Sequence, residues 1–154
     1  CVLFAPPNMG SSLARSMLPD RWEAYFKDWY FKDWEGWNDV PKQFFNTVTQ
    51  TILGEKAGMH LAQAQCPYSE ERFGSFPPEA RVLVVAGDCG EINPLLEGRS
   101  DGVVTVAETY LSTPHLRLTV SAPHNFICLH PGAVRSALDF VCGGEGEGAK
   151  EPVV

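Results

Sequence analysis

Side chains capable of acid–base chemistry follow three apolar segments of this 154-residue chain, at the points where the segments end. Asn8 and Ser11 follow the first segment, Asp88 and Asp101 the second, and His124 the third. Ligands of an open parallel sheet bind outside the carboxyl ends of its strands. We therefore expect these groups to lie together at that edge of the sheet, its carboxyl rim. An acid and a histidine at adjacent strand ends fit a charge-stabilised imidazole. The carboxylate holds one ring nitrogen, and the other nitrogen takes a proton from a nucleophile.

Two carboxylates compete for the role of this acid. Asp88 comes directly after its strand, where a carboxylate commonly caps the amides of its own loop. Asp101 stands before a glycine in a common turn pair, and the 23 residues from it to His124 leave room for a helix and a strand. A metal site built from Asp88, Asp101 and His124 is an alternative that no spacing favours. Gly87-x-x-Gly90 lacks the dinucleotide-binding fingerprint.

Three predicted strands, at residues 1–5, 81–86 and 116–121, would place these side chains at the rim. The continuous apolar run at 81–86 is typical of a parallel strand covered on both faces. The alternating run at 116–121 ends near Pro123 and predicts a strand nearer the sheet edge.

Helices are expected to connect and follow these strands. Residues 87–115 leave room for a crossover helix, with its apolar face drawn from residues 103–111. A second helix should begin at Pro131 and stop at Gly143. This order of elements predicts an α/β protein.

Residues 10–78 differ in character, because 10 of the 17 aromatic residues (4 Trp, 4 Tyr and 9 Phe) lie between positions 22 and 45. We expect an amphipathic helical insertion whose rings either pack on the core or form a lid over an apolar pocket. In the second case Trp29, Trp34 and Trp37 would contact substrate. The charges between the rings are mixed in sign, which argues against stacking on nucleic acid.

The composition indicates one globular domain, with 44% hydrophobic residues and a net charge of −7. This acidity argues against a nucleic-acid partner. No run reaches the roughly 18 apolar residues of a transmembrane span, so we expect no integral membrane segment. Five scattered cysteines without C-x-x-C spacing predict buried structural thiols and a reducing, cytoplasmic compartment.

Four segments within residues 1–141 resemble the C-terminal part of a bacterial-type α/β-hydrolase of the lipase/esterase group. They are VLFAPPNMGS at 2–11, RVLVVAGD at 81–88, DGVVTVAET at 101–109 and APHNFICLHPGAVRSALDFV at 122–141. The resemblance implies a partial α/β-hydrolase domain at 1–142, with part of its parallel sheet and a helical lid insertion at about 12–78. A flexible Gly/Glu-rich tail at 143–154 would follow it.

By this resemblance Asp101 is the acid of a catalytic triad and His124 its general base. Asn8, at the rim, and Phe126, beside the histidine, join the three tryptophans as expected substrate contacts. The implied activity is cleavage of a small-molecule ester or lipid by acyl transfer, with no cofactor and no metal.

The family's nucleophile lies in G-x-S-x-G, and this chain lacks that motif. Gly10-Ser11-Ser12 follows a strand but has no second glycine. We therefore expect the serine upstream of Cys1 and the chain alone to be inactive. A non-catalytic interaction or scaffold protein with hydrolase-like segments, and an acyltransferase on the same fold, stay open as alternatives.

Overall fold

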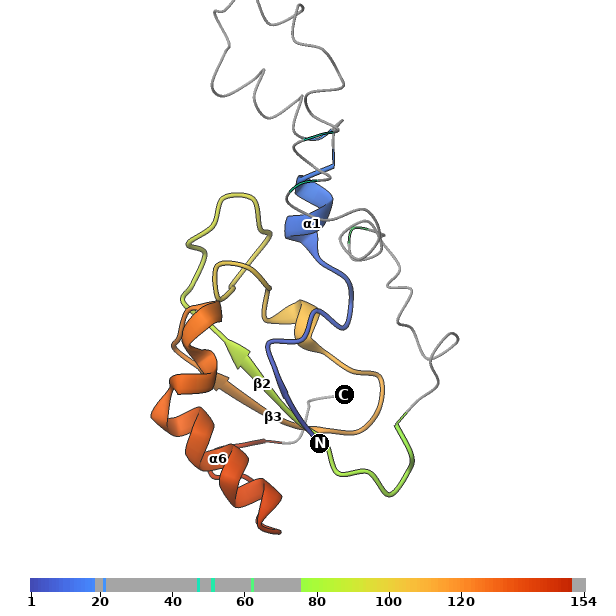
Figure 1. The fold of residues 1–154 in the computed structure, drawn as a ribbon, viewed down its shortest axis with the longest axis vertical. Helices are drawn as coiled ribbons and strands as arrows, with labels where there is room; N and C mark the ends of the chain where they lie inside the picture. Colours follow the sequence, from blue (N-terminus) through green and yellow to red (C-terminus); the bar gives the residue numbers. More distant parts are fainter. Residues whose placement is uncertain (19–20, 22–46, 48–50, 52–61, 63–75, 151–154) are drawn as a thin grey trace, which may run out of the picture.

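The computed structural model describes residues 1–18, 21, 47, 51, 62 and 76–150 (Figure 1). Within them, three parallel strands form one sheet in the order β1-β2-β3. The strands are β1 (Val2–Phe4), β2 (Leu83–Gly87) and β3 (Leu116–Val120). The three predicted strands are confirmed, with bounds that differ from the predicted ones by up to two residues, and with its helices the described part has an α/β architecture.

Strand β2 is the centre of the core. All five of its residues are buried, and Leu83, Val84, Val85 and Ala86 are fully inaccessible. Its neighbours explain this, because Leu83 lies between Val2 of β1 and Leu116 of β3 in the sheet register. The continuous apolar run is therefore a strand covered on both faces, as predicted. Strand β3 pairs with β2 alone among the named strands, in agreement with its predicted place nearer the sheet edge.

Helix α6 (Pro131–Val141) packs against the sheet along β2 and β3 (Figure 1). Pro131 begins it, and the ring of His130 caps it by accepting a hydrogen bond from the Ala133 N–H. Its buried positions are Ala133, Ser136 and Phe140, one helical face. Gly143, with φ +101°, follows its end, so the predicted helix and its stop are both confirmed.

The predicted crossover helix between β2 and β3 is wrong. Residues 88–115 hold only the 3₁₀ turn η4 (Ala107–Thr109). The backbone N–H groups of Val103 and Val104 donate to the side chain of Asp101 instead of to helical carbonyls. Asp side chains compete with helical hydrogen bonds in this way, and the apolar periodicity of the segment did not show it.

The segment after α6 returns to the sheet. Lys150 and Arg117 exchange two backbone hydrogen bonds of 2.8 Å, and the Gly146 N–H donates to the carboxylate of Asp139 at 2.9 Å. Ala149 packs against the core. Residues 143–150 of the expected tail thus have defined contacts, and residues 151–154 lie outside the described part.

The expected lid insertion at 12–78 begins with helix α1 (Ser12–Ser16), which lies past the carboxyl end of β1 (Figure 1). Most of its remaining residues, including Trp29, Trp34 and Trp37, lie outside the described residues.

The expectation of buried cysteines is wrong for the four that the structure describes. Cys1, Cys128 and Cys142 are exposed, Cys89 is half-buried, and all four are free thiols. Cys1 opens the chain and Cys142 caps the end of α6, so an apolar neighbourhood in sequence did not place them in the core. No helix within the described ranges is long and apolar enough to cross a membrane.

A buried carboxylate joins the loop after β1 to the connection between β2 and β3. Glu108, in η4, is 6% exposed and accepts hydrogen bonds from the backbone N–H groups of Thr105, at 2.8 Å, and Ser12. Its own backbone carbonyl accepts from the Met9 N–H at 3.0 Å. Arg15 lies 3.8 Å from the carboxylate. Glu108 therefore fixes residues 9–15 against η4.

Replacing Glu108 with alanine should lower the free energy of unfolding by about 1–3 kcal/mol, because the buried N–H of Thr105 and the partly buried N–H of Ser12 lose their acceptor. Urea unfolding followed by circular dichroism measures the change. Glu97→Ala is the matched control, since Glu97 is exposed, and it should change stability little. Equal losses in the two variants would show that the Glu108 contacts do not stabilise the fold.

Candidate active site

Asp101 and His124 meet beyond the carboxyl ends of β2 and β3. Asp101 lies in the loop that leaves β2, and His124 opens the 3₁₀ helix η5 (His124–Leu129), four residues past the end of β3. Asp101 Oδ2 lies 2.7 Å from His124 Nδ1. The backbone N–H of His124 also donates to the backbone carbonyl of Asp101 at 3.0 Å. Main-chain and side-chain hydrogen bonds therefore hold the two residues together.

The carboxylate of Asp101 has a defined orientation. Its side chain is 1% exposed, and Oδ1 accepts from the N–H groups of Val103 at 2.9 Å and Val104 at 2.7 Å. Such a turn suits Asp, whose side chain bonds backbone amides a few residues on. Gly102 has a φ of +95°, a backbone conformation that is unfavourable for residues with a Cβ atom and accessible to glycine. Oδ1 is thus occupied, and Oδ2 faces the imidazole.

The imidazole of His124 is 34% exposed. A carboxylate only accepts hydrogen bonds, so Nδ1 carries a hydrogen, and in the neutral imidazole Nε2 keeps its lone pair. In this tautomer Nε2 can take a proton from a hydroxyl group placed against it. The pair therefore has a buried end that fixes orientation and an accessible end that can do chemistry.

Asp88, the competing acid, is engaged within its own loop. Its Oδ2 accepts from Arg99 Nε at 2.7 Å, and its Oδ1 accepts from the Gly90 N–H at 3.0 Å. The hydrogen bond from Arg99 lowers the pKa of Asp88 below its ordinary value of 3.8. The predicted loop-capping contact is confirmed, and the carboxylate beside His124 is that of Asp101.

The proposed metal ligands do not come together. Among the residues that the structure describes, no three or more His, Cys, Asp or Glu side chains are arranged to hold a metal ion. Asp88 pairs with Arg99 while Asp101 pairs with His124, which separates the three expected ligands into two clusters.

The other residues expected at the rim have contacts of their own. Asn8 Nδ2 donates to the Thr109 carbonyl at 3.1 Å, and Ser11 caps α1 by accepting from the Ala14 N–H at 3.1 Å. Phe126, two residues after His124 in η5, is 60% exposed. Substrate contact by Asn8 and Phe126 stays a prediction, as does contact by Trp29, Trp34 and Trp37 outside the described residues.

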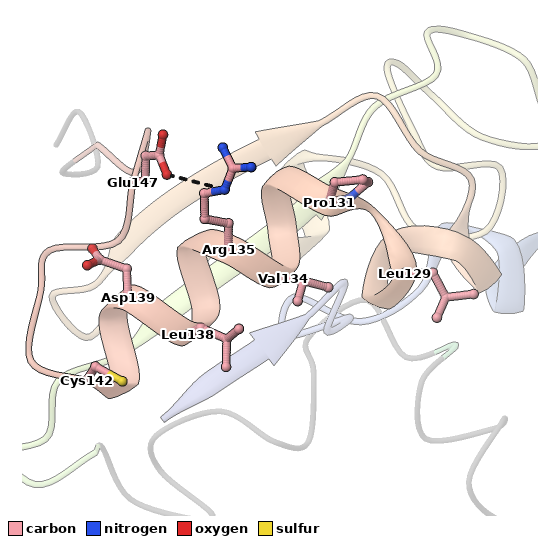
Figure 2. A pocket seen from close by; sticks show the side chains of 8 residues that line it. All are labelled: Leu129, Pro131, Val134, Arg135, Leu138, Asp139, Cys142 and Glu147. Atoms are coloured by element: carbon pink, nitrogen blue, oxygen red, sulfur yellow. Dashed lines mark ion pairs between the residues drawn. The ribbon is translucent and has the colours of Figure 1, made fainter.

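A cavity of about 910 Å³ lies elsewhere, along the outer side of α6 (Figure 2). Leu129, Val134 and Leu138 form its apolar side. Figure 2 shows Arg135 turned away from them toward Glu147, with which it forms an ion pair of 3.8 Å. Neither Asp101 nor His124 lines this cavity, so its volume carries no argument about the candidate site.

Two residues with close contacts in this part of the fold, Glu108 and Gly87, were not among the sequence candidates. Glu108 is a single acid within an apolar stretch, and Gly87 ends the apolar run of β2 directly before Asp88. An acid without a charged neighbour in an apolar run is a signal for a buried, hydrogen-bonded carboxylate. Nothing local marks Gly87, because its role depends on segments that follow later in the chain.

Comparisons with protein-family models, with curated proteins and with solved structures found no match to this chain. The function of the site is therefore inferred from its geometry.

Replacing Asp101 with asparagine should invert the tautomer of His124. The Val103 and Val104 N–H groups require an acceptor, so the asparagine oxygen should face them and its NH₂ group should face Nδ1. Nδ1 must then accept, and the hydrogen moves to Nε2. Ring ¹⁵N chemical shifts of histidine-labelled protein distinguish the two forms. An unchanged Nδ1–H form in the variant would contradict this orientation of the Asp101 carboxylate.

Asp88→Asn should destabilise the protein in a pH-dependent way. Since the folded-state pKa of Asp88 is lowered, its contribution is fully present above its ordinary pKa of 3.8 and is lost as the pH falls through the folded value. Wild type should melt higher than Asp88→Asn at pH 7, and the gap should narrow in acid. Glu97→Gln, at an exposed position, is the control, and its melting temperature should differ little from that of wild type at either pH. A gap for Asp88→Asn that is constant with pH would exclude the Arg99 pairing as its cause.

Proposed function

We propose that this chain carries the acid and the base of a serine hydrolase that cleaves carboxylic esters, either small-molecule esters or lipids. The observation that supports this most directly is the 2.7 Å contact between Asp101 Oδ2 and His124 Nδ1, with the carboxylate buried and the imidazole partly exposed. The order of the acid and the histidine along the chain, and the four segments that resemble α/β-hydrolases, support it further.

In this mechanism His124 transfers one proton in each half of the reaction. Nε2 takes the proton from a serine hydroxyl as its oxygen attacks the ester carbonyl, and it then gives that proton to the departing alcohol. In the second half Nε2 takes a proton from a water molecule as its oxygen attacks the acyl-enzyme, and it returns that proton to the serine oxygen as the acid leaves. Asp101 stays ionised throughout, keeps the hydrogen on Nδ1, and stabilises the imidazolium.

The nucleophile of the proposed reaction is a serine in a strand–turn–helix upstream of Cys1, together with backbone N–H groups for the oxyanion. The order serine, acid, histidine of the family supports this position, as does the lack of G-x-S-x-G in the 154 residues. Ser11 is a poor alternative because its hydroxyl oxygen caps α1.

The complete open reading frame that encodes this chain should hydrolyse p-nitrophenyl esters. In that protein Asp101→Asn should lower kcat by about 10⁴, the cost of the equivalent Asp change in a serine protease. His124→Ala should lower kcat by about 10⁶, because it removes the general base itself. Asp88→Asn should melt lower and keep its turnover. Ser11→Ala should also keep its turnover.

Loss of turnover in Asp88→Asn with retention in Asp101→Asn would overturn the assignment of the acid. A wild-type protein that hydrolyses no ester of any chain length would instead favour the scaffold alternative.

Trp29→Ala, Trp34→Ala and Trp37→Ala should change the preference between short and long acyl chains more than they change kcat. Large rings supply most of the area of an apolar site, and loss of uniform substrate binding raises KM without slowing the chemical step. The ratio of kcat/KM values for butyrate and decanoate esters measures the preference. If that ratio is the same in wild type and all three variants, the tryptophans do not contact substrate.

A further inference from the structure

Gly87, the last residue of β2, lies where the two halves of the candidate site approach the sheet. It is buried, and a Cβ atom at this position would lie 2.6 Å from Asp101 Cβ and 2.6 Å from the Ala122 carbonyl oxygen. It would also lie 2.7 Å from Ile127 Cδ1. Ordinary van der Waals contact begins at 3.4 Å, so all three approaches leave no room for a methyl group.

The requirement for glycine here is one of space and not of backbone conformation. Gly90 and Gly102 have positive φ angles, of 85° and 95°, and Gly87 does not belong to that group. Gly87 lies in regular parallel pairing with Val120 of β3. An alanine could therefore adopt its backbone angles, and only the neighbouring atoms exclude it.

The excluding atoms belong to the segments that carry the acid and the base. Asp101 supplies its own Cβ, Ala122 stands two residues before His124, and Ile127 anchors η5 at 1% exposure. The tip of Ile127 can move by a change of rotamer. The Ala122 carbonyl and Asp101 Cβ can move only if their backbone moves.

A retreat of the end of β2 from these contacts would break a backbone hydrogen bond to β3. The backbone N–H of Asp88 donates to the Val120 carbonyl at 2.8 Å, which ties the end of β2 to the end of β3. A methyl group at position 87 would therefore push Asp101 outward, by the difference between 3.4 Å and 2.6 Å. A shift of nearly 1 Å is large beside a hydrogen bond of 2.7 Å.

We propose that Gly87 is a positioning residue for the Asp101–His124 pair. Its missing side chain lets the Asp101 loop and the turn before His124 close over the end of β2, at the separation that the Oδ2–Nδ1 hydrogen bond needs. The catalytic meaning of this role rests on the proposed hydrolase function, whereas the geometric role does not.

The test is Gly87→Ala in histidine-labelled protein, read by the ring ¹⁵N shifts of His124. We expect His124 to lose its Nδ1–H form, although the residue that changed bears no polar group. In the complete hydrolase kcat should fall about 100-fold, the usual cost of a 1 Å misplacement, with KM unchanged.

Gly90→Ala is the matched control, because a Cβ atom there meets nothing within 4 Å while its φ of +85° still makes alanine unfavourable. It should lower the melting temperature and leave the His124 tautomer as in wild type. If Gly87→Ala also keeps the wild-type tautomer, the proposal is wrong.

A second variant covers the case in which Gly87→Ala does not fold. Gly87→Ala/Ile127→Val removes the Cδ1 contact and leaves the contacts with Asp101 and Ala122. This protein should fold and still lack the Nδ1–H form, with Ile127→Val alone as its reference. Failure of both Gly87 variants to fold would overturn the proposal, because the core and not the pair would then require the glycine.

The two measurements separate this proposal from the proposed function. A changed tautomer in Gly87→Ala, together with a wild-type protein that cleaves no ester, would support the positioning role and refute the hydrolase. An unchanged tautomer in Gly87→Ala, together with ester cleavage that needs Asp101, would refute the positioning role and support the hydrolase.

Discussion

The buried carboxylate of Asp101 is the group on which the described site depends. A buried charge is costly unless hydrogen bonds replace its hydration, and Asp101 accepts three, from Val103, Val104 and His124. These donors come from the turn that follows it and from the segment beyond β3. One side chain therefore shapes the loop after β2 and also holds the start of η5 against it.

Three of the five acids in the connection between β2 and β3 accept hydrogen bonds from backbone N–H groups, and each has a different set of partners. Asp88 pairs with a cation, Asp101 with two amides and an imidazole, and Glu108 with amides from two segments. Because these side chains occupy the backbone N–H groups of Gly90, Val103 and Thr105, the connection cannot continue as a regular helix. The irregular backbone is thus a consequence of the same hydrogen bonds that build the site.

The core and the site are in direct contact. Ile127 and Phe140 belong to the cluster that packs on Leu83 and Val85 of β2, so burial of η5 and α6 sets the depth at which His124 lies. At the end of the same strand, Gly87 leaves space for Asp101 and Ala122. Apolar packing places the imidazole, and one missing side chain admits the carboxylate beside it.

Local patterns in the sequence predicted the elements correctly where the physics is local. The apolar β-branched run of β2, the proline that begins α6 and the glycine that follows its end act within a few residues of themselves. The choice of Asp101 and His124 as candidates was also within reach of the sequence, since both residues follow strand-forming runs.

Only the tertiary structure decided which carboxylate meets the histidine, why residues 88–115 are not helical, and why position 87 excludes a side chain. It also showed that the four described cysteines lie outside the core. The periodicity of residues 103–111 did not show that Asp101 takes the amides of Val103 and Val104. Asp88 and Asp101 have the same chemistry and similar positions relative to a strand. What separates them is the arrangement of Arg99, Gly90 and His124 in space, and the distances between such groups depend on how the whole chain packs.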